Sequence, residues 1–364
     1  MYYEDLEFLT KGLVELQAEA AVKAILLFCA DKNRPDVFEI EEVLKFNTKP
    51  LIGGIFPEIL ADGQRKESGF LLVPLFQELE VLVVEAKDHE TVSHQLSTQL
   101  NTISKDFQSV FCFLNSLWRE KTIFIQELYN ELGPFVTYLG GSAGSLNFES
   151  FPCVFANQHV YENAAVLGFF KNDISMGVAH GWKKISDPIK VTASSGNTIV
   201  SLDWKPAFDV YKSHVEKHSN KLFTKNNFFE ISKSYPLGLV KLEGEMIVRD
   251  PFAAKNNSLQ ILDEVPEGEY VSIMHGDISS LLYSAKNAVE ISSQSGFSEF
   301  TQFCVDCISR VLFMETEFDK ELAHLNAYQP INGVLAIGEI ANLGNSVLEV
   351  FNKTIVVAQW KENC

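Results

Sequence analysis

Residues 21–29 read Ala-Val-Lys-Ala-Ile-Leu-Leu-Phe-Cys, a nearly continuous apolar run interrupted only by Lys23. A strand covered on both faces needs such a run, so this stretch predicts a central strand of a sheet. The preceding segment, Asp5–Ala20, carries four leucines at helical spacing. This spacing predicts an amphipathic helix that packs on the same sheet.

The rest of the chain alternates between the two periodicities. Helices are predicted over Phe38–Phe46, Thr91–Phe107, Thr122–Leu132, Pro206–Ser219, Ile278–Ser293 and Glu315–Leu325. Strands are predicted over Pro50–Leu60, Gly69–Phe76, Leu79–Glu85, Ser109–Leu114, Phe135–Leu139, Val160–Phe170, Tyr270–His275, Phe300–Cys307, Gly333–Glu339 and Leu348–Ala358. Helix-crossed strands and hairpin-like neighbours both occur, which favours mixed over purely parallel sheets. The sequence therefore predicts an α+β protein with two strand-rich parts, whose mixed and antiparallel sheets pack with helices as a layered sandwich.

A polar stretch rich in Lys and Asn divides the chain at residues 220–234 and is predicted to be a linker. The predicted amino-terminal domain spans residues 1–219 and the predicted carboxy-terminal domain spans residues 235–360. Beyond the linker the strand pattern restarts with Leu237–Leu242 and Glu245–Arg249.

The composition is that of a folded, acidic protein. Among 364 residues, 46% are hydrophobic and 21% are charged, which is ordinary for a globular chain. The formal net charge of −18 repels polyanions, so nucleic acid and anionic membranes are not expected as partners.

Three further features predict a cytoplasmic protein. The start Met1–Asp5 is acidic where an export signal would be basic. No run reaches the roughly 18–20 apolar residues that a membrane-spanning helix needs. The six cysteines are sparse for so long a chain, which favours reduced thiols over a disulfide framework.

Four stretches together resemble the FIST family (F-box and intracellular signal transduction), with both its amino- and carboxy-terminal parts. They are Tyr138–Gly144; Gly177–Trp182 with Val191–Ala193 and Gly196-Asn197; Tyr235–Gly238 with Val248-Arg249 and Val265–Gly268; and Cys307–Arg310 with Gly338–Ile340 and Phe351–Thr354. The resemblance covers about residues 20–360. One departure is Ile52–Pro57, which stands where the family has small residues and Thr or Ser.

The resemblance implies a cytoplasmic sensor that binds a small molecule, such as an amino acid or a small carboxylate. It also implies a separate signalling partner of the kinase, receptor or ligase type, since no output domain is recognised here. The alternative is a protein-interaction scaffold without a metabolite ligand. The candidate ligand-binding residues are Gly141, His180, Trp182, Arg249, Arg310, Glu339 and Asn352.

Each candidate has a structural alternative. The run Gly140–Gly144 offers either an anion-binding nest of N–H groups or a tight turn. His180 and Trp182 either contact a ligand or cover a sheet edge. Arg310 and Glu339 either pair with each other or hold the two ends of an amino acid, because a buried charge needs a partner. Arg249 is a second guanidinium of this kind.

No catalytic or metal centre is predicted, and no cofactor. Cys304 and Cys307 have CxxC spacing without a second pair, so they are interpreted as core thiols. His214 and His218 are spaced i, i+4 but lack the metalloprotease Glu and fit a solvated helix face. No Gly-x-Ser-x-Gly stretch occurs. The chain is therefore predicted not to be an enzyme.

Overall fold

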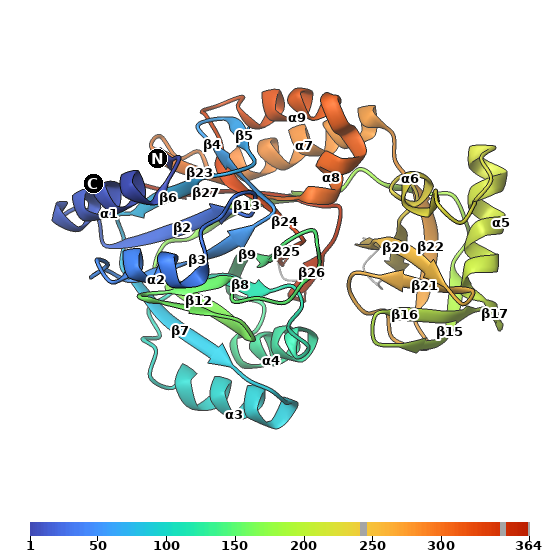
Figure 1. The fold of residues 1–364 in the computed structure, drawn as a ribbon, viewed down its shortest axis with the longest axis horizontal. Coiled ribbons are helices and arrows are strands. Elements are labelled where there is room, and N and C mark those ends of the chain that lie inside the picture. The colour runs from blue at the N-terminus through green and yellow to red at the C-terminus, as the bar shows by residue number, and fades with distance from the viewer. Residues whose placement is uncertain (241–245, 343–346, 363–364) are drawn as a thin grey trace.

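The protein is described here from a computed structural model of residues 1–240, 246–342 and 347–362. Figure 1 shows a main lobe, which contains both chain ends, and a smaller side lobe set apart from it. The main lobe is built from residues 1–182 and 276–362, and the side lobe from residues 183–275. The predicted α+β class with mixed and antiparallel sheets is confirmed.

The first sheet of the main lobe contains the apolar run from the start of the chain. Its strands in spatial order are β1 (Tyr2–Tyr3), β6 (Phe70–Leu75), β2 (Ala24–Ala30), β3 (Leu51–Phe56), β10 (Val154–Ala156) and β11 (His159–Tyr161). The two helices early in the chain are α1 (Leu6–Ala18) and α2 (Val37–Leu44). All seven residues of β2 are buried, which confirms the predicted central strand. The helix α1 buries Leu9, Leu13 and Leu16, as its spacing predicts.

The second sheet joins strands from distant parts of the sequence. Its order is β26 (Glu349–Phe351), β25 (Gly338–Ala341), β9 (Thr137–Ala143), β8 (Ser109–Asn115), β12 (Ala164–Phe170) and β7 (Leu79–Glu85). The helices α3 (His89–Leu100) and α4 (Lys121–Leu132) cover one face. Because β9 runs to Ala143, the predicted turn over Gly140–Gly144 is wrong for its first four residues. A Cβ at Gly140 would lie 1.7 Å from the Cys112 carbonyl oxygen on β8, so this glycine permits close strand packing.

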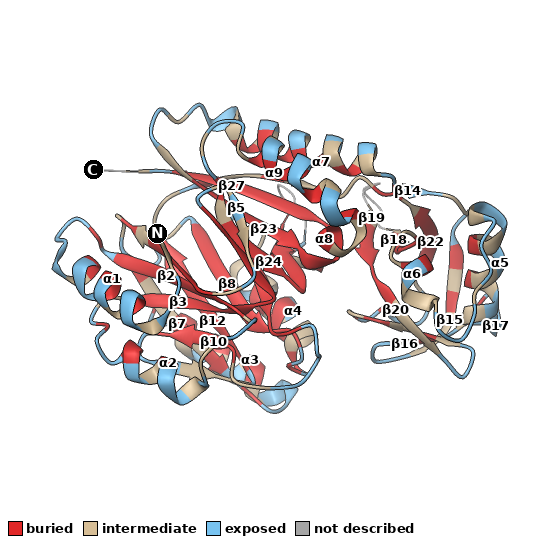
Figure 2. Ribbon diagram, turned by 45° about the horizontal axis from the view of Figure 1, so that its top comes forward, coloured by how far each residue is buried: buried red, intermediate tan, exposed pale blue. Residues whose placement is uncertain are grey.

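The third sheet is also shared between early and late segments. Its order is β13 (Ile174–Ala179), β27 (Ile355–Lys361), β23 (Phe300–Cys307), β24 (Asn332–Ala336), β4 (Glu58–Ala61) and β5 (Gln64–Lys66). Its outer face is covered by α7 (Ile278–Ser292), α8 (Ile308–Met314) and α9 (Phe318–Leu325). Aromatic rings fill the interior between sheets: the Phe28 centroid lies 5.2 Å from Phe113 and 5.3 Å from Phe303. Figure 2 shows the strands buried and the outer helix faces exposed.

The side lobe is a separate, mainly antiparallel sheet with two helices. The main path of the sheet is β19 (Met246–Arg249), β18 (Leu237–Val240), β22 (Tyr270–His275), β15 (Ile189–Ser195), β16 (Thr198–Leu202), β21 (Ser258–Ile261) and β20 (Pro251–Lys255), with β14 (Lys183–Lys184) and β17 (Lys205–Pro206) at its sides. The helices are α5 (Ala207–Ser219) and α6 (Phe228–Ser232). The helix α5 matches the predicted helix Pro206–Ser219.

The lobes divide the chain differently from the two predicted domains. The predicted linker 220–234 contains α6 and lies within the side lobe, and strands from both predicted parts share the second and third sheets. The second and third sheets therefore need the strands from the carboxy-terminal end of the chain, β25, β26 and β27, to be complete. The predicted strands Leu237–Leu242 and Glu245–Arg249 extend into residues 241–245, which lie outside the described residues. Cys364 also lies outside them. No helix in the described part is long and apolar enough to cross a membrane.

Candidate functional site

A buried group of polar side chains lies where the side lobe meets the main lobe. Its members come from β25, from the β26–β27 turn, from the β23–α8 connection and from the side lobe. We call this group the junction cluster, and its residues are Asp250, Asp263, Cys307, Ser309, Glu339, Asn352 and Lys353. All of them are buried, although six are polar or charged. Burial of so many polar groups is costly unless they are paired or serve a ligand.

Lys353 links the two lobes at the centre of the cluster. Its side chain is fully buried, and its Nζ lies 3.1 Å from Oδ2 of Asp250. The same ammonium donates to the Lys233 carbonyl at 3.1 Å and stands over the Trp182 ring at 5.2 Å. Ser309 donates a second hydrogen bond to Asp250 at 2.8 Å. The backbone of Lys353 has φ of 52°, an uncommon value for a side-chain-bearing residue. The tight β26–β27 turn thus positions the ammonium between the lobes.

Asp263 makes a second connection across the junction. Its carboxylate lies 2.6 Å from the Lys121 ammonium and accepts a 2.6 Å hydrogen bond from Nδ2 of Asn352. Burial alone would raise the pKa of Asp263, but Lys121 and Arg249 outweigh it and hold the pKa below its usual range. Asp263 is therefore ionised and fixes the orientation of the Asn352 side chain.

Glu339 differs from the other carboxylates of the cluster because no cationic side chain among the described residues forms an ion pair with it. Its Oε2 accepts a hydrogen bond from the Thr354 N–H at 3.1 Å, and the Cys307 thiol lies close to the carboxyl group. Burial raises the pKa of Glu339 well above its usual value, so the interior favours the protonated form of this carboxyl more than water does. Burial likewise raises the pKa of the Cys307 thiol.

Three acceptor atoms of the cluster lack a hydrogen-bond partner within the described part of the chain. They are Oε1 of Glu339, Oδ1 of Asn352 and Oδ1 of Asp250. Buried polar atoms almost always have a partner, and each exception calls for an explanation. All three are carbonyl or carboxylate oxygens. The cluster therefore presents unused acceptors, which suit a guest with N–H or O–H donors.

Arg310, a predicted ligand residue, is held by the protein itself. The guanidinium forms a fork with Glu321, with Nε at 3.1 Å from Oε1 and Nη2 at 2.5 Å from Oε2. Asp306 lies 3.2 Å from Nε on the same fully buried guanidinium. Further hydrogen bonds reach the carbonyl oxygens of His180 and Leu281. The ion pair considered from the sequence involves Glu321 on α9 in place of Glu339.

Arg249 joins the side lobe to the end of β26. It donates to the Val350 carbonyl at 2.8 Å, and its Nη2 lies 3.6 Å from Glu349. The side chain is buried, so these contacts hold the charge inside the junction. Arg249 therefore lies beside the cluster and contributes to its positive potential at Asp263.

The other three predicted residues lie in structural roles around the cluster. Trp182 donates its indole N–H to the Lys353 carbonyl at 3.0 Å. His180 accepts the Trp182 backbone N–H at Nδ1, and burial lowers the pKa of His180 to about 4, with Arg310 adding to the effect. A Cβ at Gly141 would lie 3.0 Å from Val305 and 3.1 Å from Ala336, so close packing explains this glycine. The structure thus brings Glu339, Asn352, Arg249 and Trp182 together, and Gly141 lies opposite Glu339 in the β9–β25 pairing.

The cysteine and histidine pairs have no metal-binding arrangement. Cys304 and Cys307 are buried free thiols, as interpreted from the sequence. Nδ1 of His218 lies 3.0 Å from the Tyr235 hydroxyl, and its ring packs against His275. Across residues 1–240, 246–342 and 347–362, no group of three His, Cys, Asp or Glu side chains is placed to hold a metal ion. The absence of enzymatic activity stays a prediction.

Comparison with protein families covers most of the chain. The FIST N domain matches residues 23–205, and the FIST C domain matches residues 207–342. The chain belongs to the FIST family. FIST domains are associated with sensory signal transduction. This FIST protein is also similar to an uncharacterized protein of Methanocaldococcus jannaschii, with 24% identity over 227 residues. That match covers 56% of this chain and 43% of the relative, so the chain spans less than half of that protein's length.

Several cluster residues of this FIST protein were not singled out from the sequence. Lys353 stands inside a stretch that carries the family resemblance, and Asp250 directly follows Arg249. The sequence therefore offered a signal at these positions. Lys121 and Asp263 carried no local signal, because their pairing joins residues 142 positions apart, counted from 121 to 263.

Proposed function

We propose that this FIST protein is a cytoplasmic sensor that binds a small ligand, an amino acid or a small carboxylate, at the junction cluster. It passes the signal to a separate protein of the kinase, receptor or ligase type, and it catalyses no reaction and uses no cofactor. The proposal joins the family's association with sensory signalling to the site at the lobe junction.

The observation that carries the proposal is the trio of buried acceptor atoms without a partner in the described chain. An ammonium group fits a pair of acceptors such as Oε1 of Glu339 and Oδ1 of Asn352, because it carries three donors and no acceptor. A ligand carboxylate would find cations close by at Lys121, Arg249 and Lys353. An amino acid carries both groups.

The lobe junction also supplies a way to signal. Charged contacts cross it at Lys353–Asp250, Lys121–Asp263 and Arg249–Glu349. A ligand that competes for one of these partners, or strengthens it, changes how firmly the side lobe is held. A ligand shifts such an equilibrium by its difference in affinity for the two arrangements.

A thermal-shift screen against amino acids and small carboxylates tests the proposal. A ligand present at 100 times its dissociation constant adds about 2.7 kcal/mol to the free energy of unfolding. The Glu339→Gln variant should lose this gain, because the amide cannot ionise to receive a cation. Glu317→Gln is the matched control, since Glu317 is an exposed carboxylate on the surface of the same lobe. Equal stabilisation of both variants would place the ligand elsewhere.

A protein-interaction scaffold remains the second candidate. It is favoured by exposed large apolar side chains near the start of the chain, namely Phe8 on α1, Phe38 on α2 and Phe46, two residues after α2 ends. Exposed apolar groups of this kind are common at protein contacts when they are contiguous. A partner that co-purifies with wild type and with Glu339→Gln alike, undisturbed by metabolites, would favour the scaffold.

A further inference from the structure

The strand β7 forms an open edge of the second sheet. Among the described strands it pairs only with β12, in antiparallel register from Leu79 opposite Phe170 to Glu85 opposite Ala164. Figure 1 shows β7 at the border of the main lobe, with α3 below it. An edge strand presents unpaired main-chain groups, which natural proteins usually cover, shorten or twist away.

The side-chain bonds of Gln95 reveal which main-chain groups of β7 face outward. Gln95 accepts the Glu85 N–H at 3.1 Å and donates to the Glu85 carbonyl at 2.8 Å, so both groups of Glu85 point away from β12. Outward and inward residues alternate along an antiparallel strand. Val83 and Val81 therefore also direct their N–H and C=O groups outward. Gln95 covers the edge at Glu85, whereas no described residue hydrogen-bonds the outward groups of the two valines.

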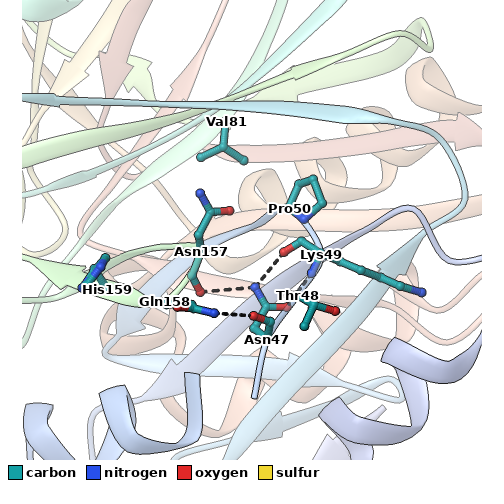
Figure 3. Close-up of a pocket in the computed structure, with 8 residues that line it drawn as sticks. All are labelled: Asn47, Thr48, Lys49, Pro50, Val81, Asn157, Gln158 and His159. Atoms are coloured by element: carbon teal, nitrogen blue, oxygen red, sulfur yellow. Dashed lines mark hydrogen bonds between the residues drawn. The ribbon is translucent and has the colours of Figure 1, made fainter. Parts of the chain in front are cut away.

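A pocket of about 450 Å³ opens beside this edge, and Val81 is part of its wall. Figure 3 shows Val81 and Pro50 above a floor of amide groups that includes Asn47, Asn157 and Gln158. The floor is rigid, because Asn47 donates to the Lys49 carbonyl at 2.7 Å and Gln158 donates to the Asn47 carbonyl at 2.7 Å. Asn157 still offers its Nδ2 and Gln158 its Oε1, which no described residue engages. The pocket thus has an apolar wall and free amide groups.

The charges around β7 select among possible occupants. Glu78 precedes the strand, Glu80 lies within it, and Glu85 ends it. A second copy paired on β7 would bring the same carboxylates to this edge, in a chain whose net charge is −18. Like charges on paired strands are destabilising. Basic residues at the ends of an incoming strand would instead be attracted.

We propose that the β7 edge and its pocket form a docking groove for an extended, basic-flanked segment of a partner protein. The segment pairs its main chain with Val81 and Val83 and places one hydroxyl- or amide-bearing side chain in the pocket, in the manner of strand addition to a sheet edge. This inference rests on the proposed function only because it gives the separate partner a docking surface. The groove and the junction cluster share no residue.

The test uses fluorescein-labelled peptides Lys-Lys-Val-Thr-Val-X-Val-Lys-Lys, with X varied, and measures binding by fluorescence anisotropy. Two N-methylated sets of the best peptide carry the methyl groups on alternate residues. Only the set that blocks the N–H groups facing β7 should lose binding, by about tenfold or more, since each lost hydrogen bond is worth about 0.5–1.5 kcal/mol and the methyl groups also clash. Val81→Pro removes one outward N–H without touching the ladder to β12, and it should weaken binding similarly.

Equal binding of both methylated sets, or no binding by any peptide of the series, would overturn the proposal. A wild-type dimer that Val81→Pro converts to monomer would show that a second copy occupies the edge, and would overturn it as well. Glu339→Gln should bind the peptide as wild type does. A failed ligand screen with intact peptide binding therefore counts against the junction site alone, and the reverse result counts against the groove alone.

Discussion

Replacing Arg310 by Ala should strongly destabilise the main lobe. The guanidinium is fully buried and is the cationic partner of both Glu321 and Asp306. It also satisfies the carbonyl oxygens of His180 and Leu281. Removing one partner of a buried ion pair costs about 3–5 kcal/mol, because the remaining charge stays desolvated. The Arg310→Ala variant should therefore lose about that much stability.

Chemical denaturation measures this loss of stability directly. Thermal denaturation gives a second measure, because a loss of 1 kcal/mol lowers the melting temperature by about 2–4 °C, so the melting temperature should fall by roughly 10 °C. Lys320→Ala is the control, because the Lys320–Glu317 pair on the same surface is exposed and such pairs contribute about 0–1 kcal/mol. Arg310→Lys should fall between the two, since it keeps the charge but loses the planar fork. A loss below about 1 kcal/mol for Arg310→Ala would refute the structural role. If Arg310→Ala lost ligand binding while its stability stayed unchanged, Arg310 would be a ligand-binding residue.

Three further results follow from the buried charges. Burial and the neighbouring Glu321 raise the pKa of Asp306, so its stabilising contribution is present at low pH and is lost as pH rises through the folded-state pKa. In urea titrations, Asp306→Asn should flatten this decline of stability with rising pH. Burial lowers the pKa of His180 to about 4, so the folded protein loses stability as pH falls from about 6.5 toward 4. This loss should be smaller in His180→Asn, and the control variant His159→Asn, at an exposed position, should behave as wild type does. Lys353→Met should leave Asp250 unpaired, and a double-mutant cycle with Asp250→Asn should return a coupling of about 1–3 kcal/mol; additive losses would contradict the link.

Local patterns predicted most of the individual elements. The run of β2 is apolar throughout and that of β8 is apolar between Ser109 and Asn115, so the pattern alone predicted a central strand in the first case and a strand in the second. The strand β23 was predicted with its observed ends, Phe300–Cys307. The glycines at 140 and 141 misled the prediction, because glycine signals either a turn or a close approach of backbones, and only the neighbouring strand tells which.

Pairings between distant residues could not be predicted in the same way. The charge on Arg310 required a buried partner, and that requirement was correct. Its partner is Glu321, which the sequence offered only as one of many acids on a helix. The sharing of sheets between β4 and β24, or between β9 and β25, depends on contacts separated by about two hundred residues or more, for which a single sequence holds no local signal.

A ligand at the lobe junction should contact Oε1 of Glu339, which has no hydrogen-bond partner among the described residues. The most direct measurement is isothermal titration calorimetry of the amino acid that best stabilises the protein, in two buffers of different ionisation enthalpy. Because burial raises the pKa of Glu339, an ammonium arriving beside it should lower that pKa and favour release of a proton. Wild type should therefore release a proton on binding and bind more tightly as pH rises, and Glu339→Gln should do neither. Binding by Glu339→Gln with the same affinity and the same proton release would contradict it.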